Sequence, residues 1–174
     1  GNIVDGKLSR ESLLFISEEK HHNLRKGHLK TGDVIFTNRG AGIGKVALVD
    51  SSFDGSNLNS QLAWLRCQKE LRSNYLYYYL QSGNAQRICD KPETGAALPQ
   101  LTIKTLTAMS VMYPPHDEQA HLVDNVSLAK DESNRLKYSY SQNLAALDEL
   151  KQSILQKAFT GQLTAESPEL ELVG

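Results

Sequence analysis

The hydrophobic residues of this 174-residue chain follow two different patterns, which meet at Pro114–Pro115. Before this dipeptide they form short runs rich in β-branched and aromatic side chains, bounded by Gly, Asn, Asp or Ser, as in strands joined by turns. After it they recur at alternating steps of four and three residues, with no Pro or Gly between 117 and 160, which is typical of a long helix. Adjacent prolines end a preceding strand or helix, so the chain divides here.

The first part predicts a mixed domain of strands and helices over residues 1–115. Its short apolar runs predict strands, and two polar segments between them predict helices, the second of them capped by Ser73 or Asn74. A turn is expected at Gly83–Asn84. The predicted strands are 13–17, 33–37, 45–49 and 62–67, and the predicted helices are 18–23 and 73–82.

The second part predicts a coiled-coil helix over 116–161, followed by a flexible tail at 162–174, so the fold class is α+β. Gly161 is the expected C-terminal stop. The helix itself, about 43 residues from about 117 to 160, spans about 65 Å. This is too long to bury its apolar stripe against a domain with a radius near 13 Å, so it needs a partner helix. The alternative is a hairpin of two helices that breaks near 131–134. The expected pairing positions are Leu122, Val126, Ala129, Leu136, Tyr140, Leu147, Leu150 and Ile154, with polar Ser133 and Asn143 in the same stripe.

Charge divides at the same point as the hydrophobic pattern. The net charge of −1 and the pI of about 6.6 argue at first against a nucleic-acid partner. Residues 1–115, however, hold 14 Lys and Arg against 10 Asp and Glu, whereas residues 116–174 hold 5 against 10. A basic half hints at a polyanionic partner, although a net of +4 also lies within ordinary scatter.

The sequence places the chain in a reducing, aqueous compartment. No apolar run approaches the length of a membrane span, and Gly1–Lys7 lacks the basic start and apolar core of a signal peptide. Cys67 and Cys89 are too few for a disulfide framework, so two free thiols in the cytoplasm are expected.

A glycine-rich stretch at 39–46 looks at first like a phosphate-binding loop. A Walker loop needs Gly where this chain has Arg39 and Ser or Thr where it has Val46. The β-rich continuation also fails to open a helix. We therefore interpret the stretch as a connection between two strands, whose tip is flanked by Arg39 and Lys45. It is either a plain hairpin loop or a loop that touches a phosphate backbone.

No catalytic or metal site can be argued from the residues. His21, His22 and His28 lack a Cys or Asp that would complete a four-ligand set, so we expect solvated histidines. No nucleophile elbow or paired carboxylates occur. The amide-rich stretch 57–61 and the loop 91–101 offer side chains able to read base edges, or are simply a self-capping turn and a connector.

Several of these stretches, in this order, resemble the specificity subunits of type I restriction–modification enzymes. They include LKTGDVIF at 29–36, RGAGIGKVA at 39–47, NSQ at 59–61, YLYYYL at 75–80, VMYPP at 111–115 and SILQKAFTGQL at 153–163. The resemblance covers about residues 29–163. No single motif is diagnostic, but the ordered set is specific.

This resemblance implies a target recognition domain followed by a conserved spacer helix. In that family a subunit usually holds two such domains, each reading half of a split DNA sequence, and two helices that pair antiparallel. The subunit is not catalytic. It recruits methyltransferase subunits, which use S-adenosylmethionine, and restriction subunits, which use ATP and magnesium, so no cofactor is expected on this chain. With one domain that starts late, this chain is a fragment of a longer subunit or a half that works as a dimer.

The expected function is sequence-specific DNA recognition. The alternatives are a coiled-coil adaptor that binds protein but not DNA, and a nucleotide-binding enzyme that uses the glycine-rich loop. Base contacts do not transfer within the family, so DNA-facing residues are nominated by chemistry and loop position alone. They are Thr37, Asn38, Arg39, Lys45, Asn59, Gln61, Lys91, Thr94 and Gln100.

Overall fold

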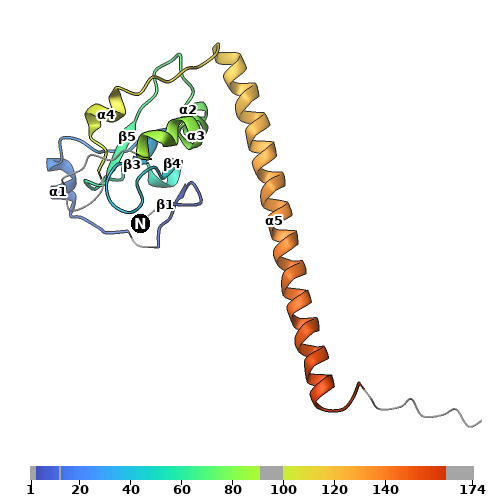
Figure 1. Ribbon diagram of the computed structural model, residues 1–174. Helices are drawn as coiled ribbons and strands as arrows, with labels where there is room; N and C mark the ends of the chain where they lie inside the picture. The colour runs from blue at the N-terminus through green and yellow to red at the C-terminus, as the bar shows by residue number, and fades with distance from the viewer. Residues whose placement is uncertain (1–2, 12, 91–99, 164–174) are drawn as a thin grey trace, which may run out of the picture. The chain divides into compact units, whose positions relative to one another are not determined.

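The computed structural model of the protein describes residues 3–11, 13–90 and 100–163 (Figure 1). The chain divides into a compact unit, Gly1–Val126, and a second unit, Ser127–Gly174, each described here by itself. In the described part, no helix is long and apolar enough to cross a membrane.

A three-stranded antiparallel sheet forms the centre of the first unit. Its order is β4 (Val46–Leu48), β3 (Val34–Thr37), β5 (Leu62–Leu65). Phe36 pairs with Val46 on one side, and Thr37 pairs with Leu62 on the other. All three strands were predicted from the sequence, each one to two residues longer than it is.

Both faces of β3 are buried, which explains its unbroken apolar run. Successive side chains of a strand point to opposite faces, so Val34 and Phe36 enter one core cluster while Ile35 enters the other. The first cluster further contains Val46, Ala63, Leu76, Tyr77, Leu80, Leu101 and Leu106, and the second contains Ile3, Leu29, Ala47, Val49 and Phe53.

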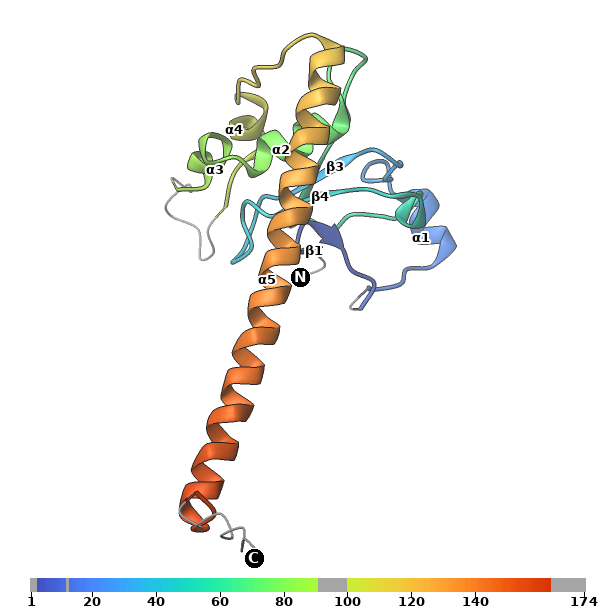
Figure 2. The same ribbon diagram turned by 90° about the vertical axis from the view of Figure 1, so that its right-hand side faces the viewer.

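Four short helical segments contribute to or adjoin the first cluster. They are α2 (Ser73–Gln81), α3 (Gly83–Gln86), the 3-10 turn η2 (Arg87–Asp90) and α4 (Ile103–Thr107). Helix α2 packs against β3 and β4, and Figure 2 shows the sheet between these helices and α1. The Tyr75 and Tyr79 hydroxyls donate to the carbonyls of Met112 (2.9 Å) and Ser110 (3.0 Å), which holds the segment leading to the long helix.

Two local predictions about these helices are wrong. Gly83–Asn84 is not a turn but the start of α3, because Ser82 caps that helix by accepting the Ala85 amide. Helix α2 is capped neither by Ser73 nor by Asn74. Its N-cap is Arg72, which makes no side-chain capping bond.

The N-terminal region contains one confirmed helix and one wrong strand. Helix α1 (Glu18–Asn23) has the predicted bounds and is capped by Ser17. The predicted strand at 13–17 does not form, and its Leu14 and Phe15 are 94 % and 93 % exposed. A strand needs a neighbour for its backbone groups, and none of the described segments pairs with this one. The segment is preceded by an antiparallel hairpin of two short strands, β1 (Ile3–Val4) and β2 (Lys7–Leu8).

A charged anchor lies just before β3. Asp33 is buried and accepts hydrogen bonds from the guanidinium of Arg66, with both N···O distances at 2.7 Å, and from the amide of Lys30. Arg66 also lies over the ring of Trp64, 4.7 Å from its centroid. A buried carboxylate needs such partners to offset its lost hydration, so this group ties the start of β3 to the end of β5.

Helix α5 is continuous over His116–Phe159, close to the predicted 117–160. The hairpin alternative is wrong, because residues 131–134 are helical. Gln119 is completely buried, and its amide bonds to Arg72, Glu70 and Pro114, so the first turns of α5 belong to the compact unit. Gly161 ends the helix in a left-handed conformation, as predicted. Residues 164–174 of the expected tail lie outside the described residues.

Candidate nucleic-acid interface

The candidate interface lies at one edge of the central sheet, where β3 ends. Because β3 is antiparallel to both neighbours, its C-terminal end meets the starts of β4 and β5. Three nominated residues therefore come to the same edge. Arg39 follows β3, Lys45 precedes β4, and Gln61 precedes β5. An isolated antiparallel bridge between Arg39 and Gln100 adds a fourth segment. The fold thus brings together four of the nominated residues.

The glycine-rich loop is a strand connection, as predicted. Its backbone bonds to itself and to the end of β3: the amides of Ile43 and Lys45 donate to Gly40 and Gly42, and that of Gly44 to Thr37. Gly40 and Gly44 have φ angles of +91° and +87°, which only glycine adopts readily. No helix follows this loop, so it lacks the anion-binding helix N-terminus of a nucleotide-binding loop.

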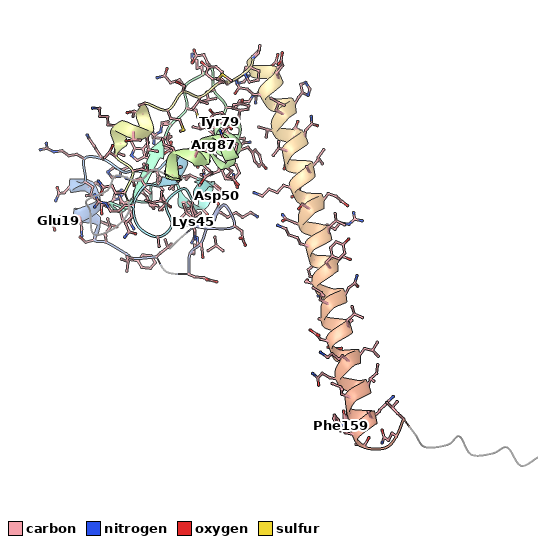
Figure 3. The ribbon with its side chains drawn as sticks, in the orientation of Figure 1. Glu19, Lys45, Asp50, Tyr79, Arg87 and Phe159 are labelled. Carbon is pink, nitrogen blue, oxygen red and sulfur yellow. The ribbon has the colours of Figure 1, made fainter. Side chains whose placement is uncertain are left out.

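The cations of this loop are accessible. The side chains of Arg39 and Lys45 are exposed, and the ion pairs found among the described residues, Asp33–Arg66 and Glu132–Arg135, involve neither of them. Figure 3 shows Lys45 among the labelled side chains. Two exposed cations on one loop are suited to phosphate oxygens.

Thr37 and Asn38 lie in the interior instead of facing outward. They are 9 % and 8 % exposed. The Asn38 amide donates to Gln61, its side-chain Nδ2 donates to Leu101 (3.2 Å), and its carbonyl accepts from the Leu101 amide. Asn38 therefore joins three segments beneath the edge, and its Oδ1 is buried without a partner in the described structure.

The two nominated residues of the amide-rich stretch before β5 have different roles. Asn59 and Gln61 are both exposed. The Asn59 Oδ1 accepts the Gln61 amide at 3.0 Å, which is the self-capping turn named above as the alternative to base readout. The side-chain amide of Gln61 makes no hydrogen bond among those of the described residues. Gln100 is half-buried. Lys91 and Thr94 lie outside the described residues.

The structure adds residues that the sequence did not single out. Gln86 donates from Nε2 to the carbonyl of Gly44 at 2.9 Å, so α3 and η2 lie against the glycine-rich loop. Arg87 comes next and is exposed, so a further cation directly follows the residue that contacts the loop (labelled in Figure 3). Neither residue stands in a recognisable motif. Only their position in the fold identifies them.

The histidines cluster without forming a metal site. The His21 ring contacts those of His22 and His28, with centroids 5.4 Å and 4.6 Å apart. The expectation of solvated histidines is right for His22 only, since His21 and His28 are half-buried. His21 bonds to Asn57 through Nδ1, and His28 bonds to the Leu24 carbonyl through Nε2. In the part of the chain that the structure describes, no group of His, Cys, Asp and Glu could hold a metal ion.

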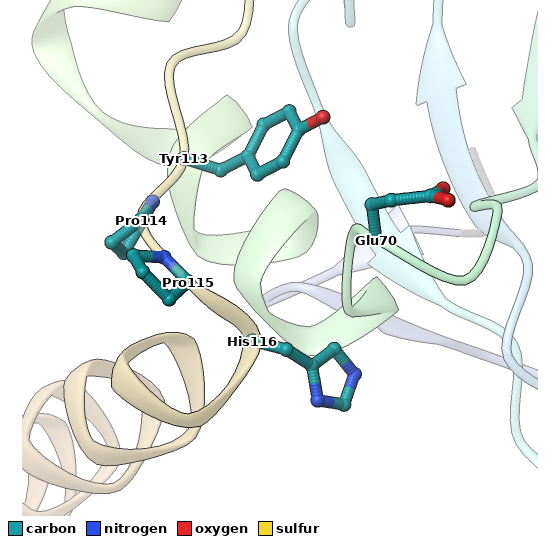
Figure 4. Close-up of a pocket in the computed structure, with 5 residues that line it drawn as sticks. All are labelled: Glu70, Tyr113, Pro114, Pro115 and His116. Atoms are coloured by element: carbon teal, nitrogen blue, oxygen red, sulfur yellow. The ribbon is translucent and has the colours of Figure 1, made fainter.

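An open pocket of about 460 Å³ lies where the compact unit leads into α5 (Figure 4). Tyr113, Pro114 and Pro115 form its apolar wall, and Glu70 and His116 are its ionisable side chains. Proline is favoured at the start of a helix, so this wall is explained by helix initiation. Among the described residues, the pocket lining contains no Ser, Cys, Thr or Lys, the commonest side-chain nucleophiles of enzymes.

The apolar stripe of α5 is exposed along its whole length. Leu122, Val126, Leu136, Tyr140, Leu147, Leu150 and Ile154 are between 44 % and 65 % exposed, and Ala129 is exposed as well. A row of large apolar side chains in water marks an interaction surface.

Comparison with known proteins identifies the family. The family model "Type I restriction modification DNA specificity domain" matches residues 13–156. The specificity subunits of the type I restriction enzymes EcoBI of Escherichia coli and EcoKI of E. coli K12 are 28 % and 27 % identical over 97 % of this chain. The chain spans only 36 % and 38 % of their lengths.

Solved structures show the same fold. A chain from a study of complex assembly and conformational transition in the type I restriction–modification system aligns with a TM-score of 0.65 at 25 % identity, over 78 % of this chain and 32 % of that one. The HsdS subunit of Thermoanaerobacter tengcongensis aligns with a TM-score of 0.63 at 19 % identity, over 99 % of this chain and 43 % of that one. With most of its length matched by the family model, the chain belongs to the type I restriction–modification DNA specificity domain family.

Proposed function

We propose that this chain is a non-catalytic DNA-reading module that acts as a specificity subunit, or half of one, in a type I restriction–modification complex. The observation that carries the proposal is the convergence of Arg39, Lys45, Gln61 and Gln100 at the edge where β3 ends. Two of these side chains are cations and two are amides. This is the combination that positions a protein on DNA and reads its bases.

The two kinds of side chain have different tasks. Arg39 and Lys45 bind phosphate oxygens, which sets the register on the duplex and makes affinity depend on salt. Gln61 and Gln100 bond to base edges, where an amide can both donate to and accept from adenine in the major groove. Asn38 supports both groups from below. Asn59 braces the turn before Gln61, and Lys91 and Thr94 stay predictions for the same interface.

The exposed stripe of α5 pairs with a second helix of the same kind. That helix belongs to a second specificity module or to a second copy of this chain. Pairing would bury the eight apolar positions, and full burial of each Leu, Ile or Val among them contributes roughly 1.5–3 kcal/mol relative to exposure. A pair of modules would then read two separate half-sites, with the helices setting the distance between them.

Antiparallel pairing centred on Tyr138 is the register we propose. It places Leu122 against Ile154 and Val126 against Leu150, and it matches the two polar positions, Ser133 and Asn143, with each other. A shift by one heptad would set Asn143 against Val126 or Tyr140 instead, leaving its amide against an apolar or aromatic side chain. A polar residue in such a seam is a recognised determinant of register.

Methyltransferase and restriction subunits are the proposed protein partners, and they would carry S-adenosylmethionine, ATP and magnesium. The proposed compartment is the cytoplasm, where the thiols of Cys67 and Cys89 stay reduced. Co-expression with a type I methyltransferase subunit should yield a complex that methylates a defined DNA sequence. Separate elution of the two proteins, with no methylation above that of the methyltransferase alone, would contradict these partnerships.

Retardation of a random duplex at low salt tests DNA binding itself. The module should retard the duplex, and added salt should release it, because phosphate contacts supply most non-specific affinity. A chain that leaves the duplex unretarded at all salt concentrations would instead be the protein-binding adaptor considered above.

A further inference from the structure

The glycine-rich loop is held by a clamp that lies outside the loop. Gln86, the last residue of α3, donates from Nε2 to the carbonyls of Gly44 (2.9 Å) and Leu80 (2.6 Å). One side-chain amide thereby joins the loop to the end of α2. The two bonded carbonyls belong to segments that are distant in sequence, so Gln86 fixes a tertiary relationship and not merely its own helix.

The fit between the loop and this clamp is close. Gly44 is buried with a φ angle of +87°. A Cβ atom at this position would lie 2.5 Å from Oε1 of Gln86 and 2.9 Å from Sγ of Cys89, closer than real Cβ contacts. Only glycine allows the loop to approach α3 and η2 so closely.

The clamp acts on the peptide group that precedes Lys45. The Lys45 amide donates to Gly42 at 3.1 Å, and its carbonyl accepts from the Thr37 amide at 2.8 Å. With Gln86 on the carbonyl of Gly44, the peptide groups on both sides of the Lys45 α-carbon are each held by at least one hydrogen bond. The exposed ammonium is thus carried by a backbone that cannot reorient without breaking one of these bonds.

We infer that Gln86 is a positioning residue for DNA binding, acting through Lys45. The inference rests on the proposed function. Gln86 is half-buried and need not touch DNA. By holding the Gly44 carbonyl it fixes the direction from which Lys45 meets a phosphate. A cation fixed in advance loses less conformational freedom on binding than one on a mobile loop.

Gln86→Met tests the clamp without changing charge. Methionine has the same unbranched length but no amide donor. The matched control is Gln81→Met, because Gln81 donates only to Tyr77, four residues earlier in its own helix, among the described bonds. The readouts are the affinity for a random duplex, its dependence on salt, and the thermal unfolding midpoint.

We expect Gln86→Met to weaken duplex binding by roughly fivefold and to lower the salt slope by about one, as for one lost phosphate contact. Gln81→Met should bind like the wild type. In a Lys45→Ala background the effect of Gln86→Met should fall below about twofold, because residues that act as one unit are not additive.

Three outcomes would overturn the inference. The first is equal binding by the two methionine variants, and the second is the same loss from Gln86→Met with and without Lys45. The third is a Gln86→Met protein that is unfolded at the assay temperature, which would assign Gln86 to stability. Failure of the wild type to bind any duplex would be a different result, since it contradicts the proposed function itself.

Discussion

Arg39 and Gln100 pair through an antiparallel backbone bridge, although one follows β3 and the other lies beyond α3 and η2 in the sequence. The neighbouring residues Asn38 and Leu101 form two hydrogen bonds with each other. The Leu101 backbone amide donates to the Asn38 carbonyl, and the Asn38 side chain donates to the Leu101 carbonyl. A cation and an amide that the sequence separates are thereby fixed side by side. This pairing gives the proposed interface a rigid base.

Removal of Arg66 should destabilise the fold strongly, because it leaves the Asp33 carboxylate buried without its main partner. Arg66 is 39 % exposed, so solvent moderates the loss, and we expect Arg66→Ala to lower the free energy of unfolding by about 2 kcal/mol. The control is Arg135→Ala, whose partner Glu132 is 3.7 Å away on the surface of α5. Urea denaturation of both variants measures the two losses in the free energy of unfolding. Equal losses would show that the Asp33–Arg66 pair is no more important than a surface pair.

Stability should decline at alkaline pH partly through Cys67. Burial raises the pKa of this thiol above its ordinary value of 9.0, against a smaller lowering by a hydrogen bond with Ser73. The folded state therefore keeps the proton that the unfolded chain loses above about pH 9, so stability falls as pH rises through this range. Cys67→Ala should be less stable than the wild type at pH 7, and the gap should narrow by pH 10. A gap that stays constant in urea midpoints measured across this range would contradict the assignment.

Substitution within the apolar stripe of α5 should abolish pairing. Leu136→Glu places a charge in the centre of the proposed seam, and burying an unpaired charge is costly. Leu128→Glu is the matched control, because Leu128 is 69 % exposed and lies off the seam. Sedimentation should show a dimer for the wild type and for Leu128→Glu, and a monomer for Leu136→Glu. A monomeric wild type at tens of micromolar would remove homodimerisation from the account.

The antiparallel register predicts a specific cross-link. With Cys67 and Cys89 first replaced by Ser, the double variant Ser133→Cys with Asn143→Cys should form covalent dimers on mild oxidation, since the proposed register sets the two positions opposite each other. Ser133→Cys alone should not, because two copies of residue 133 would be about 15 Å apart along the helix. Efficient cross-linking of the single variant would instead show a parallel pair.

Much of the fold could be predicted because its signals are local. The run Val34–Phe36 identified β3, and the four-three spacing after Pro115 identified the long helix. The segment at 13–17 has the apolar composition of a strand, but it pairs with none of the segments that the structure describes, and pairing is not a local property. The cap of α2 was misplaced for a similar reason, because the Arg72 amide is satisfied by Gln119 from another element.

The interface could be predicted only in part. Arg39 and Lys45 were found because cations that flank a glycine-rich loop between strands are exposed. Asn38 has the same loop chemistry but is buried, since Gln61 and Leu101 come to it from segments far along the chain. Gln86 cannot be predicted from the sequence, because its role depends on a contact with Gly44 that only the folded chain makes.

Salt-dependent binding of a random duplex by the edge variants tests the central claim most directly. Arg39→Ala and Lys45→Ala should each weaken binding and lower the salt slope by about one. Lys69→Ala is the control, because this exposed cation follows the opposite end of β5 and should leave affinity and slope close to those of the wild type. If all three variants bound with the same affinity and slope as the wild type, the edge where β3 ends would not be the DNA-binding surface.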